Sequence, residues 1–502
     1  MDDKRIERNL KELVNGLPDV VIIGNELQQI TSIALDSRKV VPGALFIAIP
    51  GQKEDGFLYI EEAIAKGAVA VMVGRPYQAG KNVAILLVHD VRLVTSYIAR
   101  RFYGLPDEML HMIGITGTNG KTTVATIGQF LIDEEVPSVG MLGTIHYDLG
   151  GKFTFPSSKT TPEAIELQAM LDQMVRRGCR SAIMEVSSHG IALKRVQYVT
   201  FDVVVFLNLT QDHLDFHGDL ENYFKEKVKL FTGSLGCLPK FAIINIDDPY
   251  GRRLIEYIPN EVTVMTFGSS EYATIRASNI ALSSEGLSFM LHWPSGEIGV
   301  ASSLLGAYNV SNVLASLAIG WVSGKKMDAL AMKLKDFRGV RGRMEKVDIG
   351  QDFSVLVDYA HTGDALLNVL KILRQITPGR LLVVYGCGGD RDRGKRFSMT
   401  KVAQEWADLA WATSDNPRSE TIESIFEDMR SAVIIPEKIF FIPERRRAIE
   451  KALEEAREGD CVLIAGKGHE TFQAIGNKII PFDDCEVARE LLIFKNKVNV
   501  TI

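Results

Sequence analysis

The stretch Gly114-Ile115-Thr116-Gly117-Thr118-Asn119-Gly120-Lys121-Thr122-Thr123 decides the fold of this 502-residue chain. Apolar residues just before it, beginning at Met112, indicate a short buried strand, and residues 124–131 after it read as a helix. Glycines allow the backbone to approach a phosphate closely, and the amide groups at a helix N-terminus face an anion. A strand, this loop and a helix together predict a site that binds the phosphates of ATP or GTP.

The loop is a shorter variant of the common phosphate-binding pattern. That pattern places a first glycine five residues before the glycine of its Gly-Lys pair, and Ile115 occupies this position here. The remaining motif runs from Gly117 to Thr123. Within it, Lys121 is expected to neutralise phosphate charge, and a threonine hydroxyl is expected to bind Mg²⁺.

Strands and helices alternate after the loop. The predicted strands are residues 181–186, 203–209 and 242–246, with helical stretches between them such as residues 164–177. This alternation favours a mostly parallel sheet covered by helices on both faces. A β-rich run over residues 274–300 and a helix over residues 309–322 complete the central part of the chain.

Two further α/β units flank the central one. The N-terminal unit has predicted strands at residues 44–49 and 83–88 and a helix at residues 60–65. The C-terminal unit has predicted strands at residues 354–357, 381–385, 409–413 and 462–465. We therefore predict an α/β protein of three domains. These are a small α/β domain over residues 1–104, a central phosphate-loop domain over residues 105–337, and a C-terminal Rossmann-like domain over residues 338–502.

Composition excludes several classes of protein. Charged residues are 24% and hydrophobic residues 46% of the chain, and the net charge of −6 gives no support for a nucleic-acid-binding surface. No apolar run approaches the ~18–20 residues that span a bilayer. The N-terminus Met1-Asp2-Asp3-Lys4 lacks an apolar signal segment, and five scattered cysteines without a Cys-x-x-Cys pair suit a reducing cytoplasm. The basic run Arg445-Arg446-Arg447 is expected to be a solvated helix face.

Acidic and histidine residues follow two of the central strands. Glu185 ends the strand at residues 181–186, where a carboxylate can face the nucleotide and serve Mg²⁺. An ordinary acidic strand end is the alternative, and the neighbouring phosphate loop favours the metal role. The segment 208–218 contains two histidines and two aspartates, which is typical of a polar loop near a metal. No glutamate separates His213 from His217 in the manner of a zinc protease, and a structural role remains open for either ring.

Four polar loops follow strands of the C-terminal unit. They are residues 358–362, 386–396, 414–418 and 466–470. In open α/β sheets, ligands bind at these carboxyl ends of the strands. Arginine pairs with carboxylates, and aspartate or glutamate receives an ammonium group. The set therefore favours a zwitterionic ligand, with a purely structural polar network as the alternative.

Together these motifs resemble the Mur ligases, and among them the MurE type, the UDP-N-acetylmuramoyl-tripeptide synthetases of bacterial cell-wall assembly. The resemblance covers nearly the whole chain. It is carried in order by Asp36-Ser37-Arg38, Pro42–Phe46, Asp55-Gly56, Gly117–Thr123, Thr160-Thr161-Pro162, Glu185–His189, Arg195, Asn208–Gly218, Asn309–Asn312, Gly342–Glu345 and the four C-terminal loops. The chain departs from the family pattern at Phe57, Leu193, Arg341 and Gly363, none of which belongs to the phosphate or metal set.

The resemblance implies a cytoplasmic amide ligase of peptidoglycan precursor synthesis. ATP and Mg²⁺ would be its cofactors, and UDP-N-acetylmuramoyl-L-alanyl-D-glutamate and meso-2,6-diaminopimelate its substrates. The D-glutamate carboxylate would attack the γ-phosphate, and the amine of the amino acid would displace phosphate from the resulting acyl phosphate. A monomer with no nucleic-acid partner and no membrane insertion is expected.

The resemblance also implies the site residues. Those for ATP are Gly117, Thr118, Asn119, Gly120, Lys121, Thr122, Thr123, Asn309, Arg343 and Asp358. Those for the UDP-muramoyl-peptide are Ser37, Thr160, Thr161, Ser187 and Arg195. Those for Mg²⁺ are Thr122, Glu185, His213 and Lys227, the last as a carbamate (N6-carboxylysine) that replaces an ammonium by an anionic oxygen ligand. The implied catalytic set is Lys121, Glu185, His213 and Lys227.

The identity of the added amino acid depends on the loop Asp415-Asn416-Pro417-Arg418, which resembles that of diaminopimelate-adding enzymes. In this interpretation Arg391 and Arg418 hold the distal carboxylate. The other expected contacts are Asp415, Asn416, Gly466 and Glu470. L-Lysine has no distal carboxylate, so a lysine-adding enzyme would leave an arginine unpaired there.

The sequence is also compatible with functions other than a diaminopimelate-adding ligase. The same ligase could add L-lysine. A folylpolyglutamate-synthetase-like ligase or the next ligase of the wall pathway is disfavoured by the Asp-Asn-Pro-Arg and Gly-Lys-Gly-His-Glu loops. A nucleotide-binding switch would not need Arg391, Arg418 and Glu470 to converge. A phosphate-loop kinase would release a stable phosphorylated product.

Overall fold

The computed structural model describes residues 6–51, 55–78, 80, 82–134, 138–151 and 153–499, with side chains up to residue 495. Residues 1–4, on which the expectation about a signal segment depends, lie outside this range. The chain forms two compact units. The first is Met1–Ala277 with His292–Gly296 and Ser311–Leu330, and the second is Ser278–Leu291 with Glu297–Val310 and Ala331–Ile502. In the ranges that the structure describes, no helix is long and apolar enough to cross a membrane.

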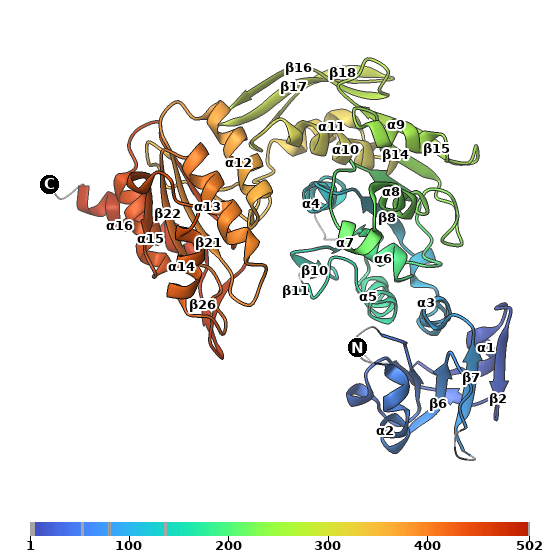
Figure 1. Ribbon diagram of the computed structural model, residues 1–502. Coiled ribbons are helices and arrows are strands. Elements are labelled where there is room, and N and C mark those ends of the chain that lie inside the picture. The colour runs from blue at the N-terminus through green and yellow to red at the C-terminus, as the bar shows by residue number, and fades with distance from the viewer. Residues whose placement is uncertain are drawn as a thin grey trace. The chain divides into compact units, whose positions relative to one another are not determined.

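The N-terminal part of the first unit is built on a five-stranded sheet of order β2-β7-β6-β5-β4 (Figure 1). Its strands are β2 (Val20–Ile23), β4 (Ser32–Ala34), β5 (Ala44–Ile47), β6 (Ala68–Val73) and β7 (Ala84–Val88). Helices α1 (Leu10–Val14) and α3 (Val91–Phe102) pack into one apolar core, and α2 (Ile60–Ala65) packs into another. A short pair, β1 (Arg8–Asn9) with β3 (Gln29–Ile30), adjoins α1. The predicted α/β character of this part is confirmed.

The central sheet has the strand order β11-β10-β9-β12-β8-β13-β14-β15-β16-β17-β18. Its first eight strands along the chain are β8 (His111–Thr116), β9 (Val139–Leu142), β10 (His146–Asp148), β11 (Thr154–Pro156), β12 (Ser181–Glu185), β13 (Val203–Phe206), β14 (Phe241–Asn245) and β15 (Thr263–Gly268). β8 lies between β12 and β13 and is parallel to both. Because Glu185 pairs with Ile115 and Phe206 with Thr116, the carboxyl ends of these three strands meet at one edge.

Helices cover both faces of the central parallel strands. The helices of this part of the chain are α4 (Lys121–Ile132), α5 (Ala164–Arg176), α6 (Ser188–Ala192), α7 (Leu214–His217), α8 (Leu220–Val228), α9 (Pro249–Ile255), α10 (Tyr308–Val322) and α11 (Met327–Leu334), and α7 is the short one that buries no side chain. Side chains alternate along β12: Met184 joins the core that contains residues of α5 and α8, while Ile183 lies against Gly128 of α4. Burial on both faces explains why these strands read as continuous apolar runs in the sequence.

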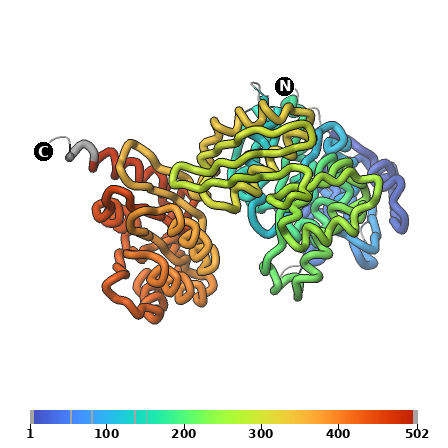
Figure 2. Tube along the Cα trace, turned by 90° about the horizontal axis from the view of Figure 1, so that it is seen from above, coloured from blue at the N-terminus to red at the C-terminus, as the bar shows by residue number. Residues whose placement is uncertain are grey.

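The predicted β-rich run consists of β16 (Ile275–Ser283), β17 (Gly286–Trp293) and β18 (Gly296–Ser302). Figure 2 shows these long strands side by side in yellow-green, in agreement with their order in the sheet. The hairpin of β10 and β11 was not predicted. Its strands are only three residues long and carry little periodic signal.

The second unit contains a six-stranded sheet of order β19-β20-β24-β21-β22-β23. Its strands are β19 (Glu345–Lys346), β20 (Ser354–Asp358), β21 (Leu381–Cys387), β22 (Leu409–Ser414), β23 (Ile439–Phe441) and β24 (Cys461–Ala465). Along β21, Leu381 and Val383 face the core shared with α12 (Gly363–Ile376), α13 (Gly394–Trp406) and α14 (Ile422–Arg430). Leu382 and Val384 face the core of α15 (Arg445–Glu455) and α16 (Asp484–Asn499), on the opposite face (Figure 1).

From β20 to β23 all adjacent strands of this sheet are parallel, so the loops after β20, β21, β22 and β24 meet at one edge. A hairpin of β25 (Phe472–Ile475) and β26 (Lys478–Pro481) follows β24. Each of the three predicted domains thus contains a sheet of its own. The boundaries at residues 104/105 and 337/338 stay predictions.

The prediction that Arg445 lies on a solvated face is wrong. Its side chain is fully buried, pairs with Asp484 at 2.6 Å, and donates to the carbonyl oxygens of Ser414 and Ala465. Arg446 and Arg447 are the solvated part of the run, with side chains 44% and 49% exposed. Arg445 is the first residue of α15, in phase with the buried residues three, four and seven positions later, so it faces the sheet.

Candidate functional site

The phosphate loop connects β8 to α4 at the centre of the sheet edge. Gly120 has φ +89°, which favours glycine, and a Cβ there would lie 2.4 Å from Oδ1 of Asn312. Gly120 is also the N-cap of α4, and the helix has no side-chain cap hydrogen bond there. Nζ of Lys121 donates to the carbonyl oxygens of Gly117 and Thr118 at 2.9 Å each. The ammonium group is thus held on the loop that is predicted to bind phosphate.

The loop after β13 is hydrogen-bonded to the phosphate loop. The backbone amide of Asn119 donates to Oδ1 of Asn208 at 2.9 Å, and Nδ2 of Asn208 donates to the carbonyl of Asn119 at 3.1 Å. The hydroxyl of Thr118 accepts from the amide of Thr210 at 3.0 Å. These bonds hold the loop in shape without using the amides at the start of α4.

Glu185 is buried beside the start of α4. Its carboxylate accepts from the hydroxyl of Thr122 at 3.0 Å, and from the amide and hydroxyl of Thr144 at 2.7 and 3.0 Å. Only 1% of Glu185 is exposed, so the acidic strand end is an interior group. Two oxygen donors that were predicted to serve one metal, Thr122 and Glu185, are therefore in direct contact.

Lys227 is buried behind the phosphate loop. Nζ donates to the carbonyl of Gly117 at 3.1 Å and to the hydroxyl of Thr116 at 3.4 Å, and it lies 4.5 Å from the ring centre of Tyr223. Burial lowers the pKa of Lys227 well below its ordinary value, and the nearby charge of Lys121 adds to this effect. The side chain is therefore an amine that resists protonation.

His213 lies in a cluster of rings next to this lysine. Its ring centre is 4.8 Å from that of His189 and 6.3 Å from that of Tyr223. His213 has φ +53° and is exposed, whereas Nε2 of His217 is hydrogen-bonded to the hydroxyl of Ser188 at 2.9 Å. Within the described parts of the chain, no three His, Cys, Asp or Glu side chains gather into a group that could hold a metal ion.

The predicted contacts to the muramoyl-peptide gather around the end of β12. The hydroxyl of Thr161 donates to the carbonyl of Glu185 at 2.9 Å and is 3.1 Å from the hydroxyl of Ser187. Arg195 donates to the carbonyl of Thr161 at 3.1 Å and pairs with Glu163 at 2.9 Å. Nε of Arg195 is buried and has no hydrogen-bond partner among the described atoms. Thr160 joins the group through the hydroxyl of Thr144, at 3.0 Å.

Ser37 lies apart from these residues, in the N-terminal sheet region. It is buried at the start of a 3₁₀ turn, Ser37–Lys39, and its hydroxyl donates to Glu62 at 2.9 Å. The same region contains a cavity of ≈ 320 Å³ at the ends of β5, β6 and β7. Arg75 and Arg92 line the cavity, and Ser37 is not among its lining residues. Arg75 pairs with Asp55 at 3.0 Å and lies 4.0 Å above the ring of Phe57.

Three predicted ATP contacts belong to the second unit. Asp358 is buried at the end of β20 and accepts from the amides of Met344 and Ala360 at 2.8 Å each. Burial raises the pKa of Asp358, and the charge of Arg343 opposes that rise. Arg343 lies 5.1 Å from the ring centre of Tyr359, and Nδ2 of Asn309 donates to the carbonyl of Leu305 at 2.8 Å.

The six residues predicted to bind the amino acid all line one cavity of ≈ 210 Å³ in the second unit. They are Arg391, Asp415, Asn416, Arg418, Gly466 and Glu470. Tyr359, His361 and Lys395 also line it, although the sequence pattern did not single them out. The sheet brings these loops together because β20, β21, β22 and β24 are adjacent and parallel.

A buried lysine organises one side of this cavity. Nζ of Lys467 donates to Oε2 of Glu470 at 3.0 Å and to Oδ1 of Asn416 at 3.3 Å, while Nδ2 of Asn416 donates to Glu470 at 2.9 Å. Asp415 is nearby and buried. Burial raises its pKa, and the charges of Arg445 and Lys467 oppose that rise. The Gly-Lys-Gly-His-Glu loop is one of the four predicted ligand loops, although its lysine was not among the predicted contacts.

Family models match three successive stretches of the chain. They are the Mur ligase family catalytic domain over residues 29–103, the Mur ligase middle domain over residues 115–320, and the Mur ligase glutamate ligase domain over residues 342–468. The chain belongs to the Mur ligase family. The fold class and the family resemblance predicted from the sequence are confirmed, and this Mur ligase is an ATP-dependent ligase.

Similar Mur ligases match over nearly the full length. A UDP-N-acetylmuramoyl-L-alanyl-D-glutamate–2,6-diaminopimelate ligase of Geobacillus kaustophilus is 43% identical over 486 residues, which are 96% of this chain and 98% of the relative. The ligase of the same name from Solibacter usitatus is 42% identical over 487 residues, with the same coverage. A solved structure with this name is 33% identical, has a TM-score of 0.72, and matches over 97% of this chain and 99% of its own.

Proposed function

We propose that this Mur ligase joins 2,6-diaminopimelate to UDP-N-acetylmuramoyl-L-alanyl-D-glutamate at the expense of ATP, as the names of its relatives indicate. The observation that carries the proposal is the cavity of the second unit. Two arginines, Arg391 and Arg418, and two acidic groups, Asp415 and Glu470, line the same space. A ligand with both carboxylate and ammonium groups at its far end matches this set, because arginine pairs with carboxylates and acidic groups accept from ammonium.

The first chemical step would occur at the phosphate loop. The D-glutamate side-chain carboxylate attacks the γ-phosphorus of ATP, the bond to the β-phosphate oxygen breaks, and ADP and an acyl phosphate result. Two anions approach each other in this step, so positive charge from Lys121 and the N-terminal end of the α4 dipole would stabilise the transition state. The diaminopimelate amine then attacks the acyl carbon, phosphate leaves, and an amide forms.

Mg²⁺ fits the residues at the start of α4. Protein sites for Mg²⁺ commonly use one or two carboxylates together with substrate phosphates. The carboxylate of Glu185 and the hydroxyl of Thr122 are 3.0 Å apart beside the loop, and both are oxygen donors. When bound, the ion would supply charge that neutralises the phosphates. We propose His213 and Lys227 as contributors to a second ion, with Lys227 in its carbamate form.

The low pKa of Lys227 supports the carbamate assignment. An unprotonated amine can add to carbon dioxide, and burial favours this form of Lys227 because it lowers the pKa well below its ordinary value. The product is a carboxylate on a lysine side chain, with loss of one proton. The carboxylate of this carbamate would provide an oxygen ligand next to the phosphate loop.

Other residues would bind the remaining parts of the two substrates. We propose that Thr160, Thr161, Ser187 and Arg195 bind the muramoyl-peptide. Thr161 is hydrogen-bonded to Ser187, Arg195 and the carbonyl of Glu185, and Thr160 is linked to the Glu185 carboxylate through Thr144. The N-terminal region, with Ser37, would take the UDP part. Asn309, Arg343 and Asp358 would serve the nucleotide. The enzyme would act in the cytoplasm as a monomer.

Phosphate release tests the function. Purified protein is incubated with ATP, Mg²⁺ and UDP-N-acetylmuramoyl-L-alanyl-D-glutamate, with meso-diaminopimelate or L-lysine as the acceptor. We expect release with diaminopimelate and a far lower rate with L-lysine, and a product whose mass equals that of the two joined substrates. Release with neither acceptor would contradict the ligase proposal. Release with L-lysine alone would contradict the role of Arg418.

A further inference from the structure

The two loops that carry Arg391 and Arg418 are packed backbone to backbone. The amide of Gly389 donates to the carbonyl of Asn416 at 3.0 Å, and a Cβ on Gly389 would lie only 1.8 Å from the carbonyl oxygen of Pro417. A Cβ on Gly388 would lie 3.0 Å from Nη1 of Arg418 and 3.7 Å from Cγ of Arg391. The spacing between the two arginines thus depends on how these loops are joined.

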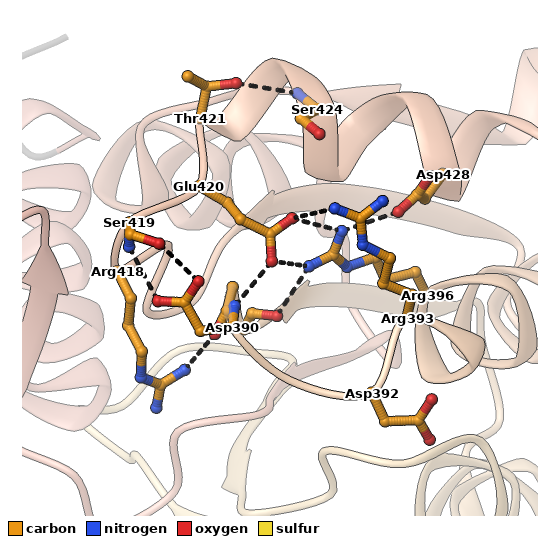
Figure 3. A network of polar contacts seen from close by, with 12 residues as sticks. Asp390, Asp392, Arg393, Arg396, Arg418, Ser419, Glu420, Thr421, Ser424 and Asp428 are labelled. Carbon is orange, nitrogen blue, oxygen red and sulfur yellow. Dashed lines mark hydrogen bonds and ion pairs between the residues drawn. The ribbon is translucent and has the colours of Figure 1, made fainter.

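Glu420 connects the two loops through an ion pair with the buried Arg396 (Figure 3). Its carboxylate accepts from both terminal nitrogens of Arg396, at 2.7 and 3.0 Å, and from the backbone amide of Asp390 at 2.7 Å. Arg396 is fully buried, and it also donates to Asp428 at 2.8 Å and to the carbonyl of Gly388 at 3.3 Å. The Glu420 carboxylate belongs to the loop that carries Arg418. It therefore ties that loop to the backbone next to Arg391.

A second link runs in the opposite direction. Asp390 accepts from the hydroxyl of Ser419 at 2.6 Å and from its amide at 3.1 Å (Figure 3). Nη1 of Arg418 donates to the carbonyl of Gly389 at 2.8 Å. Asp390 and Arg418 both have φ +54°, a conformation that residues with a side chain rarely adopt. Two such residues, each within or next to these hydrogen bonds, indicate that the links impose the loop shape.

The network is charged at neutral pH. The hydrogen bonds from Arg396 lower the pKa of Glu420 to about 2, so the carboxylate is ionised and its bonds are charge-assisted. Neither Glu420 nor Arg396 is among the described residues that line the cavity. They hold the backbone of the two loops whose arginines line it.

We propose that Glu420 and Arg396 are positioning residues for amino-acid selection, which fix the separation of Arg391 and Arg418 so that both guanidinium groups reach one distal carboxylate. The inference rests on the proposed function of this cavity. It predicts that loss of the link weakens recognition of the distal carboxylate and leaves the nucleotide and UDP-substrate steps intact. An acceptor without that carboxylate should be insensitive to the loss.

The test compares Glu420→Gln with the wild-type enzyme. The amide has the shape of the carboxylate but not its charge. We expect the KM for meso-diaminopimelate to rise about 10- to 100-fold, since small displacements of positioning groups have effects of this size. The KM values for ATP and UDP-N-acetylmuramoyl-L-alanyl-D-glutamate, and kcat at saturating diaminopimelate, should stay within about twofold of wild type. The low rate with L-lysine should not change, so discrimination between the two acceptors falls.

The matched control is Glu423→Gln, which makes the same change at an exposed position of α14. It should resemble wild type. Ser419→Ala removes only the hydroxyl bond of the second link, leaves the backbone bonds in place, and should raise the KM for diaminopimelate in the same direction by a smaller factor. This variant decides the question if thermal unfolding shows that Glu420→Gln does not fold.

The outcomes separate the two proposals. A wild-type enzyme that releases no phosphate with diaminopimelate contradicts the proposed function. In a second outcome, the wild-type enzyme releases phosphate with diaminopimelate while the folded Glu420→Gln variant shows all three KM values raised equally, or none of them raised. That result overturns only the positioning role. An unchanged KM for diaminopimelate in Ser419→Ala, where Glu420→Gln is unfolded, overturns it as well.

Discussion

The amine of Lys227 donates a hydrogen bond to the carbonyl of Gly117 in the protein interior. Burial there disfavours the charged form of the lysine. The lysines of this helix look alike in the sequence, and an ordinary helix places most of them in solvent. Lys225 is exposed, and its Nζ is 3.8 Å from Glu221. Lys227 differs because its position on α8 turns it toward the phosphate loop. The environment of a single side chain, and not its type, gives it a chemical role.

Substitution of Lys227 by alanine tests that role. If the carbamate helps to hold a metal, Lys227→Ala should reduce kcat by about 100-fold or more, the scale seen when one group that stabilises developing charge is removed. Short carboxylic acids such as acetate should restore part of the phosphate release, because they can occupy the space of the missing carboxylate. The matched Lys225→Ala variant should be close to wild type. Normal activity of Lys227→Ala would contradict the carbamate.

In the first turn of α15, the helix decides which of three neighbouring arginines is buried. Arg445 has the same type as its two neighbours, but the helix turns it into the sheet, where it pairs with Asp484 of α16. Its two carbonyl partners, Ser414 and Ala465, immediately precede Asp415 and Gly466 of the amino-acid cavity. The helix pair on one face of the sheet is therefore bonded to the strand ends that form the site.

Breaking this buried pair should destabilise the protein. Arg445→Met leaves Asp484 buried without its partner, and we expect a loss of about 3–5 kcal/mol in the free energy of unfolding of the unit that contains it. The control Arg446→Met, which removes an exposed pair with Glu490, should cost less than about 1 kcal/mol. Urea unfolding followed by circular dichroism gives both values. Equal losses in the two variants would show that the buried pair contributes little.

At the scale of the whole molecule, the two proposed binding sites belong to different compact units. The phosphate loop and Glu185 lie in the first unit, and the cavity with Arg418 lies in the second. Several predicted nucleotide contacts, such as Asp358, also belong to the second unit. A ligase that joins an activated carboxylate to an amine needs both reactants oriented together, and orientation can supply ~7–11 kcal/mol of the barrier.

This division predicts separable binding. Arg418→Met should raise the KM for meso-diaminopimelate about 100-fold, because a charge-assisted bond to the distal carboxylate is lost. The affinity for a non-hydrolysable ATP analogue, measured by calorimetry, should stay within about twofold of wild type. Arg446→Met is again the matched control. A parallel loss of nucleotide affinity in Arg418→Met would show that the loop also shapes the nucleotide site.

Much of the fold could be predicted from local pattern. β8, the phosphate loop and α4 follow from apolar residues, glycines and a lysine within a short stretch. The four strands that end in polar loops were predicted in the second unit as well, because each is a continuous apolar run. The short hairpin of β10 and β11 escaped prediction, since three-residue strands carry no clear period.

The chain itself determined the family, the phosphate loop and the types of residue in each candidate site, because these depend on neighbours in sequence. Only the tertiary structure decided which polar side chains are buried away from solvent. It buried Glu185 against Thr122, Lys227 behind Gly117, and Arg445 against Asp484. It also showed Glu420 joining two loops that lie about 30 residues apart. Burial and charge pairing arise from contacts between distant segments, so no local pattern can specify them.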